Sequence, residues 1–484
     1  MRFLVLALLF CLSSPALAEK VAMVIGMGAY QNVPGLKNTI NDANRVGQKL
    51  EQVGFKVTYA IDATQAQLLQ LMDRFSFESE TADVALVYFA GHGVEVSGEN
   101  FLIPVDAKVA NILDVARVSI SVNQILKTVD HARKMRIVII DACRNNPFGK
   151  LLPVEGLNDA PKAQGLAAVN PEQGTLVAFA ASQGQVAMDG RGENSPYATA
   201  LMEAVVQPNL EIGLMFRRVR DEVLAATENK QLPWTDGSLS GEPFYLAGTS
   251  AAAPEAADDP RLAWAAAPAD TETRMRALAE EGDTRSMIGL AYMAQNPDDS
   301  RYDPKLAFDY MSRAAKAGEA VAQFELAQIY ERGLGVAPDP TRALELYQAA
   351  ADQGLPDALN DLGFLHFQGG LGLAPDQALG IEYFQKAADQ RQPEAMFNMA
   401  GMIDAGFIKG QGPAQAAAYL YDALRAGSQD VLDQLTTNAD AFSAKTRVEL
   451  QKILQKRDFL KGKADGQFGP SAISAIRLAY GLTG

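Results

Sequence analysis

Residues 136–145, Arg-Ile-Val-Ile-Ile-Asp-Ala-Cys-Arg-Asn, constrain the fold more than any other stretch of this chain. Four consecutive β-branched residues occupy positions 137–140. Such a run is too short for a helix and is typical of a parallel strand that is covered on both faces. Polar residues from Asp141 onward and Pro147 end the strand. Because open α/β sheets carry their chemistry just beyond the carboxyl ends of the strands, Cys143 lies where a reactive group is expected.

A second apolar strand lies upstream and ends in a histidine. Residues 83–90 predict a strand, and Gly91-His92-Gly93 follows it. If the two strands are neighbours, their ends lie about 5 Å apart, and His92 and Cys143 face each other across one crevice. A thiol is mostly protonated near neutral pH and becomes a nucleophile only beside a base or a positive charge. The two strand ends therefore predict a nucleophilic cysteine with an assisting histidine.

The two motifs, Ala90-Gly91-His92-Gly93 and Asp141-Ala142-Cys143-Arg144, resemble those of the caspase/metacaspase clan of cysteine peptidases in its bacterial caspase-like form. A histidine about 50 residues upstream of the cysteine is the spacing found in caspases. The resemblance covers residues 19–248 and implies a six-stranded, mostly parallel sheet with helices on both faces. Predicted strands and helices alternate over the same residues, which independently favours such a sheet.

The resemblance also assigns roles at the site. It implies that Cys143 is the nucleophile, that His92 assists it, and that the backbone N–H groups of Gly93 and Cys143 form the oxyanion hole. Glycine on both sides of His92 leaves room for a substrate backbone. The alternatives for the two side chains are a buried, inert cysteine and a core histidine.

Two carboxylates are expected in the pocket for the P1 side chain, which belongs to the residue on the amino side of the cleaved bond. Asp141 leaves its strand on the same side as Cys143, because it precedes that residue by two positions. Asp42 matches the metacaspase Asn-Asp motif that lines the same pocket, and Ser182, after the fifth strand, is expected to border it. Two carboxylates suit a P1 arginine or lysine. Asp42 is alternatively a favourable charge at the start of a helix.

The predicted elements of this α/β part follow one another closely. Strands are expected at residues 21–25, 55–61, 83–90, 136–140, 174–181 and 244–247, the last of them at the edge of the sheet. Helices are expected at residues 41–53, 64–77, 121–131, 194–206 and 211–226. Residues 93–104 predict a small hairpin over the site. The long polar loop 145–172 contains Lys150 and Lys162, which are candidate sites for activating self-cleavage.

The first 18 residues predict a secretory signal peptide. An apolar core leads to Ala16-Leu17-Ala18, an A-x-A cleavage site that would leave Glu19 as the first residue. The apolar run is too short to span a bilayer, so no transmembrane segment is expected after cleavage. The alternative is an uncleaved N-terminal anchor. Cleavage would remove Cys11 and leave Cys143 as the single cysteine of an exported protein, periplasmic or secreted.

Composition excludes several kinds of partner and cofactor. The formal net charge is −15, which argues against nucleic acid as a partner. Two cysteines and three histidines are too few for a zinc site of the usual kind. Calcium activates some metacaspases, but no cluster of calcium ligands stands out in this sequence. No cofactor and no metal are therefore expected.

Residues 249–270 form an Ala/Pro-rich linker, and residues 271–440 carry helical repeats. The segment 314–318, Ala-Ala-Lys-Ala-Gly, recurs at 350–354 and again at 387–391, a period of 36–37 residues that indicates an α-solenoid. These units resemble Sel1-like repeats, which are relatives of the tetratricopeptide family. Residues 271–313 look like a degenerate first copy, and the third copy departs from the pattern at Arg391. A solenoid offers a concave surface to a protein partner, which the sequence does not identify.

The C-terminal segment, residues 441–484, predicts another small helical piece. Its turn Asp465-Gly466-Gln467-Phe468-Gly469-Pro470 resembles the second half of a peptidoglycan-binding-like domain. The alternative is a helical pair that caps the solenoid.

The sequence thus favours an exported, caspase-like cysteine endopeptidase that cuts after arginine or lysine and is targeted by its repeats. A catalytically inactive caspase-like scaffold, acting as a periplasmic protein-interaction module, is the main alternative. A nonproteolytic hydrolase with the same Cys-His dyad is a further one, against which the two carboxylates argue.

Overall fold

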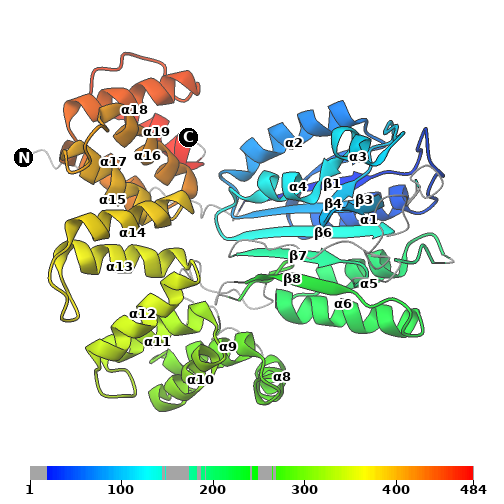
Figure 1. Ribbon diagram of the computed structural model, residues 1–484, viewed down its shortest axis with the longest axis horizontal. Coiled ribbons are helices and arrows are strands. Elements are labelled where there is room, and N and C mark those ends of the chain that lie inside the picture. The colour runs from blue at the N-terminus through cyan, green and yellow to red at the C-terminus, as the bar shows by residue number, and fades with distance from the viewer. Residues whose placement is uncertain are drawn as a thin grey trace, which may run out of the picture.

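The computed structural model of the chain describes residues 19–143, 148, 174–182, 187–190, 192–239, 243–248, 264 and 269–482. The predicted signal peptide, nearly all of the 145–172 loop with Lys150 and Lys162, and most of the 249–270 linker lie outside these residues. An α/β part and an all-helical part lie side by side (Figure 1).

A single mixed sheet organises the α/β part. Its main path has the order β2-β1-β3-β6-β7-β8, of which only β8 runs antiparallel to its neighbour. The strands are β1 (Lys20–Gly26), β2 (Phe55–Ile61), β3 (Val84–Val96), β6 (Met135–Cys143), β7 (Thr175–Phe179) and β8 (Trp234–Ser238). The predicted six-stranded, mostly parallel sheet is confirmed.

The β-branched run of β6 is explained by the two layers of helices around the sheet. Ile137 and Ile139 belong to the core under α1 (Thr39–Gln52), α5 (Pro196–Val205) and α6 (Ile212–Ala226). Val138 and Ile140 belong to the core under α2 (Gln65–Ser79) and α4 (Val122–Val129). Because both faces are covered, consecutive positions of the strand must all be apolar.

A hairpin extends β3 beyond the sheet. β3 turns at Ser97 and Gly98, both with positive φ, and pairs antiparallel with β4 (Glu99–Leu102). β5 (Ile120–Ser121) then pairs with β4, after a short helix α3 (Ile112–Val118) that the sequence did not indicate. This confirms the hairpin predicted for residues 93–104.

The prediction of the last strand at residues 244–247 is wrong. The sixth strand is β8, and Tyr245 forms only an isolated bridge with Glu211. Asp236 and Gly237 interrupt the β-forming residues of β8 and conceal it in the sequence. Gly237 is required there, because its φ is 142° and an added Cβ would lie 2.1 Å from the carbonyl oxygen of Thr175.

The helical part is a series of antiparallel pairs. These are α8 (Ala269–Glu280), α9 (Thr284–Gln295), α10 (Pro304–Lys316), α11 (Ala320–Arg332), α12 (Pro340–Asp352), α13 (Pro356–Gln368), α14 (Gln377–Asp389), α15 (Pro393–Asp404), α16 (Pro413–Ala426), α17 (Gln429–Thr437), the 3₁₀ turn η1 (Ala439–Ala441), α18 (Ala444–Lys456) and α19 (Pro470–Tyr480). One hydrophobic core runs through all of it, from Trp264 to Ala479. The departure at Arg391 does not end the series, since α15 and α16 continue it; Arg391 itself adopts positive φ where the earlier copies have Gly318 and Gly354.

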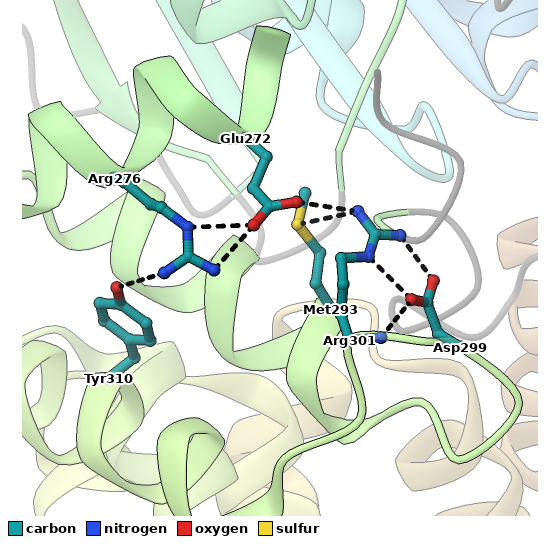
Figure 2. A network of polar contacts seen from close by, with 6 residues as sticks. All are labelled: Glu272, Arg276, Met293, Asp299, Arg301 and Tyr310. Atoms are coloured by element: carbon teal, nitrogen blue, oxygen red, sulfur yellow. Dashed lines mark hydrogen bonds and ion pairs between the residues drawn. The ribbon is translucent and has the colours of Figure 1, made fainter. Parts of the chain in front are cut away.

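A polar network ties the first three helices of the solenoid together (Figure 2). Glu272 of α8 accepts hydrogen bonds from Arg276 and Arg301, at 2.7 Å and 3.4 Å. Arg276 reaches Tyr310 of α10, and Arg301 pairs with Asp299 in the loop after α9. Every charged member of this network has a partner of opposite charge. The network therefore stabilises the packing of the first helices of the solenoid.

Both ends of the solenoid touch the α/β part. At its start, Arg285 of α9 forms a two-pronged ion pair with the buried Glu211, at 2.7 Å and 3.1 Å. At its end, the buried Arg425 of α16 pairs at 3.1 Å with Glu80, which follows α2. Arg133 donates to the carbonyl oxygen of Tyr480, the last residue of α19.

These last contacts fix the solenoid to one edge of the sheet. Glu80 and Arg133 lie just before β3 and β6, so the end of the solenoid docks at the amino ends of these strands. β6 points away from the helical part (Figure 1). The carboxyl ends of β3 and β6 are therefore at the opposite edge, clear of this contact.

Candidate active site

His92 and Cys143 occupy paired positions at the carboxyl ends of neighbouring strands. β3 and β6 run parallel and in register from the pair Val84 and Met135 to the pair His92 and Cys143. Adjacent strands lie about 4.8 Å apart, so the two backbones bring these residues beside each other. The edge at which they meet is the one where α/β sheets bind ligands.

The ring of His92 is held by a loop that follows β1. Its Nε2 lies 2.9 Å from the carbonyl oxygen of Pro34, and the ring of Tyr30 packs against it at 4.7 Å. A carbonyl can only accept, so Nε2 carries the proton and the neutral ring presents a bare Nδ1. This Nδ1 is buried and has no hydrogen-bond partner among the described residues. Burial lowers the pKa of His92, while Pro34 and Asp189 act in the opposite direction. The neutral ring can therefore accept a proton at Nδ1.

Gly91 is required for this arrangement. The N–H of His92 donates to the Tyr30 hydroxyl at 2.8 Å. A Cβ at position 91 would lie 2.7 Å from that hydroxyl. Tyr30 can thus bind the backbone of His92 only if residue 91 is glycine.

The two predicted carboxylates are buried together beneath this edge. Asp42 is 2% exposed and accepts hydrogen bonds from the Asn194 side chain at 2.6 Å and from the Ser195 N–H at 3.1 Å. Asp141 is 7% exposed and accepts from the hydroxyls of Ser195, at 2.8 Å, and Tyr88, at 3.1 Å. Side chains alternate along β6, and Asp141 lies on the face that α1 and α5 cover. Asp42 is part of α1, and Ser195 immediately precedes α5. This explains why the three meet.

No cation neutralises this pair within the part of the chain that the structure describes. Neither carboxylate forms an ion pair with a lysine or arginine there. Burial raises the pKa of Asp42 to about 6 and that of Asp141 to about 7. After burial, the negative charge of Asp42 is the next contribution to the raised pKa of Asp141, and the exposed Asp189 contributes to the raised pKa of both carboxylates. A buried site with two unpaired carboxylates is suited to a cationic ligand.

Comparisons with known proteins identify both parts of the chain. The family model of the caspase domain matches residues 19–245. The model of the Sel1 repeat matches residues 284–319, 320–355 and 356–391. The chain carries a caspase domain followed by Sel1 repeats.

Individual proteins are similar to this chain over part of their lengths. The mucosa-associated lymphoid tissue lymphoma translocation protein 1 homolog of Mus musculus is 30% identical over 146 residues, which are 29% of this chain but only 17% of that protein. A solved Sel1 repeat protein from Oxalobacter formigenes is 24% identical, covers 46% of this chain and 58% of its own, and has a TM-score of 0.33. Caspase-1 from Spodoptera frugiperda is 16% identical, covers 48% of this chain and 92% of its own, and has a TM-score of 0.36.

The structure also places two further predicted site residues of the caspase domain, Gly93 and Ser182. Gly93 continues β3 and pairs with Leu102 of β4, and its N–H was expected in the oxyanion hole together with that of Cys143. Ser182 lies after β7, where its N–H donates to the carbonyl oxygen of Leu232 at 2.6 Å. Ser182 is thus tied to the segment before β8.

Sequence reasoning missed five residues around the dyad and the carboxylates of the caspase domain. Two of them, Asn194 and Ser195, stand at the start of a predicted helix, where nothing in the sequence indicates a contact with the carboxylates. The remaining ones are Tyr30, Pro34 and Tyr88, which contact His92 or Asp141. Their partners lie 53 to 62 positions away, so no local pattern reports the contacts.

The described residues of the chain hold no group of three or more histidine, cysteine, aspartate or glutamate side chains placed to bind a metal ion. In the same residues, no helix is both long and apolar enough to cross a membrane.

Proposed function

We propose that this protein is an exported cysteine endopeptidase that cleaves peptide bonds after arginine or lysine. One observation carries the proposal. His92 and Cys143 are paired in register at the carboxyl ends of β3 and β6, and Asp141, two residues before Cys143, belongs to a buried pair of carboxylates that forms no ion pair with a lysine or arginine among the described residues. The dyad supplies the chemistry, and the carboxylates supply the specificity.

The reaction uses the bare Nδ1 of His92. This nitrogen takes the proton of the Cys143 thiol, and the thiolate attacks the carbonyl carbon of the P1 residue. The N–H groups of Gly93 and Cys143 stabilise the oxyanion. The amide C–N bond then breaks, and His92 returns its proton to the leaving amine. Water hydrolyses the resulting thioester, which frees the acid and restores the thiol.

The P1 side chain is recognised by charge. A guanidinium or ammonium group that enters the pocket beside Asp141 and Asp42 meets two carboxylates already held by hydrogen bonds. Charge-assisted hydrogen bonds to a buried site are stronger than those in water. A P1 aspartate would add a third negative charge to the same space and is expected to be rejected.

The remaining parts serve targeting in this proposal. The predicted signal peptide exports the chain, and the Sel1 repeats recruit a protein partner. The end of the solenoid docks at the amino ends of β3 and β6, at the edge opposite to the paired His92 and Cys143. α18 and α19 contribute Leu450, Leu454 and Ile476 to the solenoid core. This favours a capping role for the tail over a separate peptidoglycan-binding module.

A covalent probe tests the proposal against an inactive scaffold. A peptide with P1 arginine and an acyloxymethyl ketone would be incubated with the purified protein and with Cys143→Ala. Labelling confined to Cys143, and faster than with a P1 aspartate analogue, is the expected result. Absence of labelling would contradict the endopeptidase and favour the scaffold.

A further inference from the structure

Ser195 forms hydrogen bonds with both buried carboxylates. Its N–H donates to Asp42 at 3.1 Å, and its hydroxyl donates to Oδ2 of Asp141 at 2.8 Å. The same hydroxyl oxygen accepts the N–H of Ala198 at 2.9 Å and so caps α5. Ser195 is 5% exposed. A single buried serine therefore joins the start of α5 to the two acidic groups.

The proton positions in this set follow from the chemistry of the partners. The Ser195 hydroxyl has one proton, and an N–H from Ala198 already points at its oxygen, so the proton goes to Asp141. Tyr88 also donates to Oδ2 of Asp141. Both bonds engage one carboxylate oxygen, and neither of these partners occupies Oδ1.

Asn194 holds the other carboxylate in a similarly fixed way. Its Oδ1 accepts a hydrogen bond from Arg45 at 2.6 Å, and its Nδ2 donates to Asp42 at 2.6 Å. Arginine can only donate, so the amide of Asn194 must present its NH₂ group to Asp42. Arg45 thereby acts on Asp42 through Asn194.

We infer that Ser195 is a specificity-determining residue, which positions Asp42 and Asp141 as a pair so that together they bind a cationic P1 side chain. The inference rests on the proposed function for the identity of the substrate and adds a residue to it. Ser195 does not touch the substrate, because both of its polar groups are used on the carboxylates and the helix. It acts as a positioning residue for a guanidinium or ammonium ligand.

The same contacts determine when the carboxylates are charged. Asp141 is faced by Asp42, Asp189, Tyr88 and Tyr197, and Asp42 is faced by Asp189 and Arg45. Burial raises the pKa of Asp141, whereas the hydrogen bonds that it accepts from Ser195 and Tyr88 lower it. Removing the Ser195 hydroxyl would leave Tyr88 alone to offset the effect of burial, so Asp141 would ionise at higher pH.

The test compares Ser195→Ala with Ser195→Thr, which retains the hydroxyl, and with Ser121→Ala. Ser121 is a buried serine that caps α4 on the other face of the sheet, so its loss reproduces the loss of a helix cap without touching the pocket. Cleavage of a P1-arginine peptide would be followed from pH 5 to 9. In parallel, binding of agmatine, a decarboxylated arginine, to the Cys143→Ala background would be measured by calorimetry.

Ser195→Ala is expected to raise KM for the P1-arginine peptide by about 10- to 100-fold, with a smaller change in kcat. Its pH midpoint should move upward, and agmatine binding should weaken in proportion. Ser195→Thr should have a KM, a pH midpoint and an agmatine affinity close to those of the wild type. Ser121→Ala should change none of these three. Equal effects of Ser195→Ala and Ser121→Ala, or an unmoved pH midpoint, would overturn the inference.

Agmatine separates this inference from the proposed function. If the wild-type protein cleaves no peptide but binds agmatine in a Ser195-dependent way, the proposed peptidase activity is wrong, whereas the inferred role of Ser195 in cation binding is supported. If Cys143→Ala binds no agmatine at any pH, the pocket does not take cations and the inference fails as well.

Discussion

Asp42 and Asp141 are joined through Ser195, whose N–H donates to the first and whose hydroxyl donates to the second. Two carboxylates from different elements are thereby held in one buried space without a cation of the described chain to balance them. Such an arrangement costs folding free energy, because burial disfavours the charged forms. A cationic ligand, as proposed for the P1 side chain, would offset this cost.

The stability of Asp141→Asn is the first prediction. The pKa of Asp141 is about 7 in the folded protein, above the ordinary value of 3.8, so its ionisation destabilises the fold as pH rises between these values. Asp141→Asn lacks this penalty. Thermal unfolding should show the variant more stable than wild type at pH 8, by on the order of 4 kcal/mol, and nearly equal at pH 4. The exposed Asp221→Asn serves as the control; a gain of the same size at both pH values would argue against a buried charge.

The pH dependence of substrate selection is the second prediction. Carboxylates with pKa values of about 6 and about 7 are mostly protonated below pH 6 and mostly charged above pH 7. Cleavage of a P1-arginine peptide should therefore rise steeply across this window. Burial lowers the pKa of His92, so any rise in activity that comes from losing the proton of the histidine is shifted toward lower pH and is shared by every peptide. A P1-norleucine peptide should lack the rise, and parallel profiles for the two peptides would exclude the carboxylates as its cause.

Gly91→Ala is the third prediction. The new Cβ would lie 2.7 Å from the Tyr30 hydroxyl and would force Tyr30 away from the backbone of His92. Activity on the P1-arginine peptide should fall by at least about 10-fold, since a small displacement of a catalytic group is costly. Gly401→Ala, on the solenoid, has no atom within 4 Å of its added Cβ and is the matched control. Full activity of Gly91→Ala would mean that the Tyr30 contact does not position the histidine.

The docking of the solenoid gives the fourth prediction. Arg425 is buried, pairs with Glu80, and donates to the carbonyl oxygen of Ala479 at 3.0 Å. Arg425→Ala leaves Glu80 without this partner and should destabilise the protein by about 3 kcal/mol. Proteolysis should then cut α18 and α19 sooner, while peptide cleavage stays unchanged because this contact is at the opposite edge of the sheet. The exposed Arg342→Ala is the control, and loss of activity in Arg425→Ala would show that the two edges are coupled.

Much of the fold was predictable because its signals are local. The β-branched run of β6 and the period of 36–37 residues in the solenoid each follow from nearby residues. β8 was missed, since Asp236 and Gly237 break its pattern and its pairing with β7 is a long-range contact. The same limit applies at the site. The positions of His92 and Cys143 follow from strand ends, whereas Pro34 and Ser195 enter only through the packing of distant segments.

Cleavage of two fluorogenic peptides tests the central claim most directly. The peptides would differ only in having arginine or aspartate at P1, and the enzyme would be the purified protein beside Cys143→Ala and His92→Ala. The account predicts that the arginine peptide alone is cut, above pH 7, and that both variants abolish the cleavage. Cleavage of the aspartate peptide instead, or arginine cleavage that survives in Cys143→Ala, would contradict it.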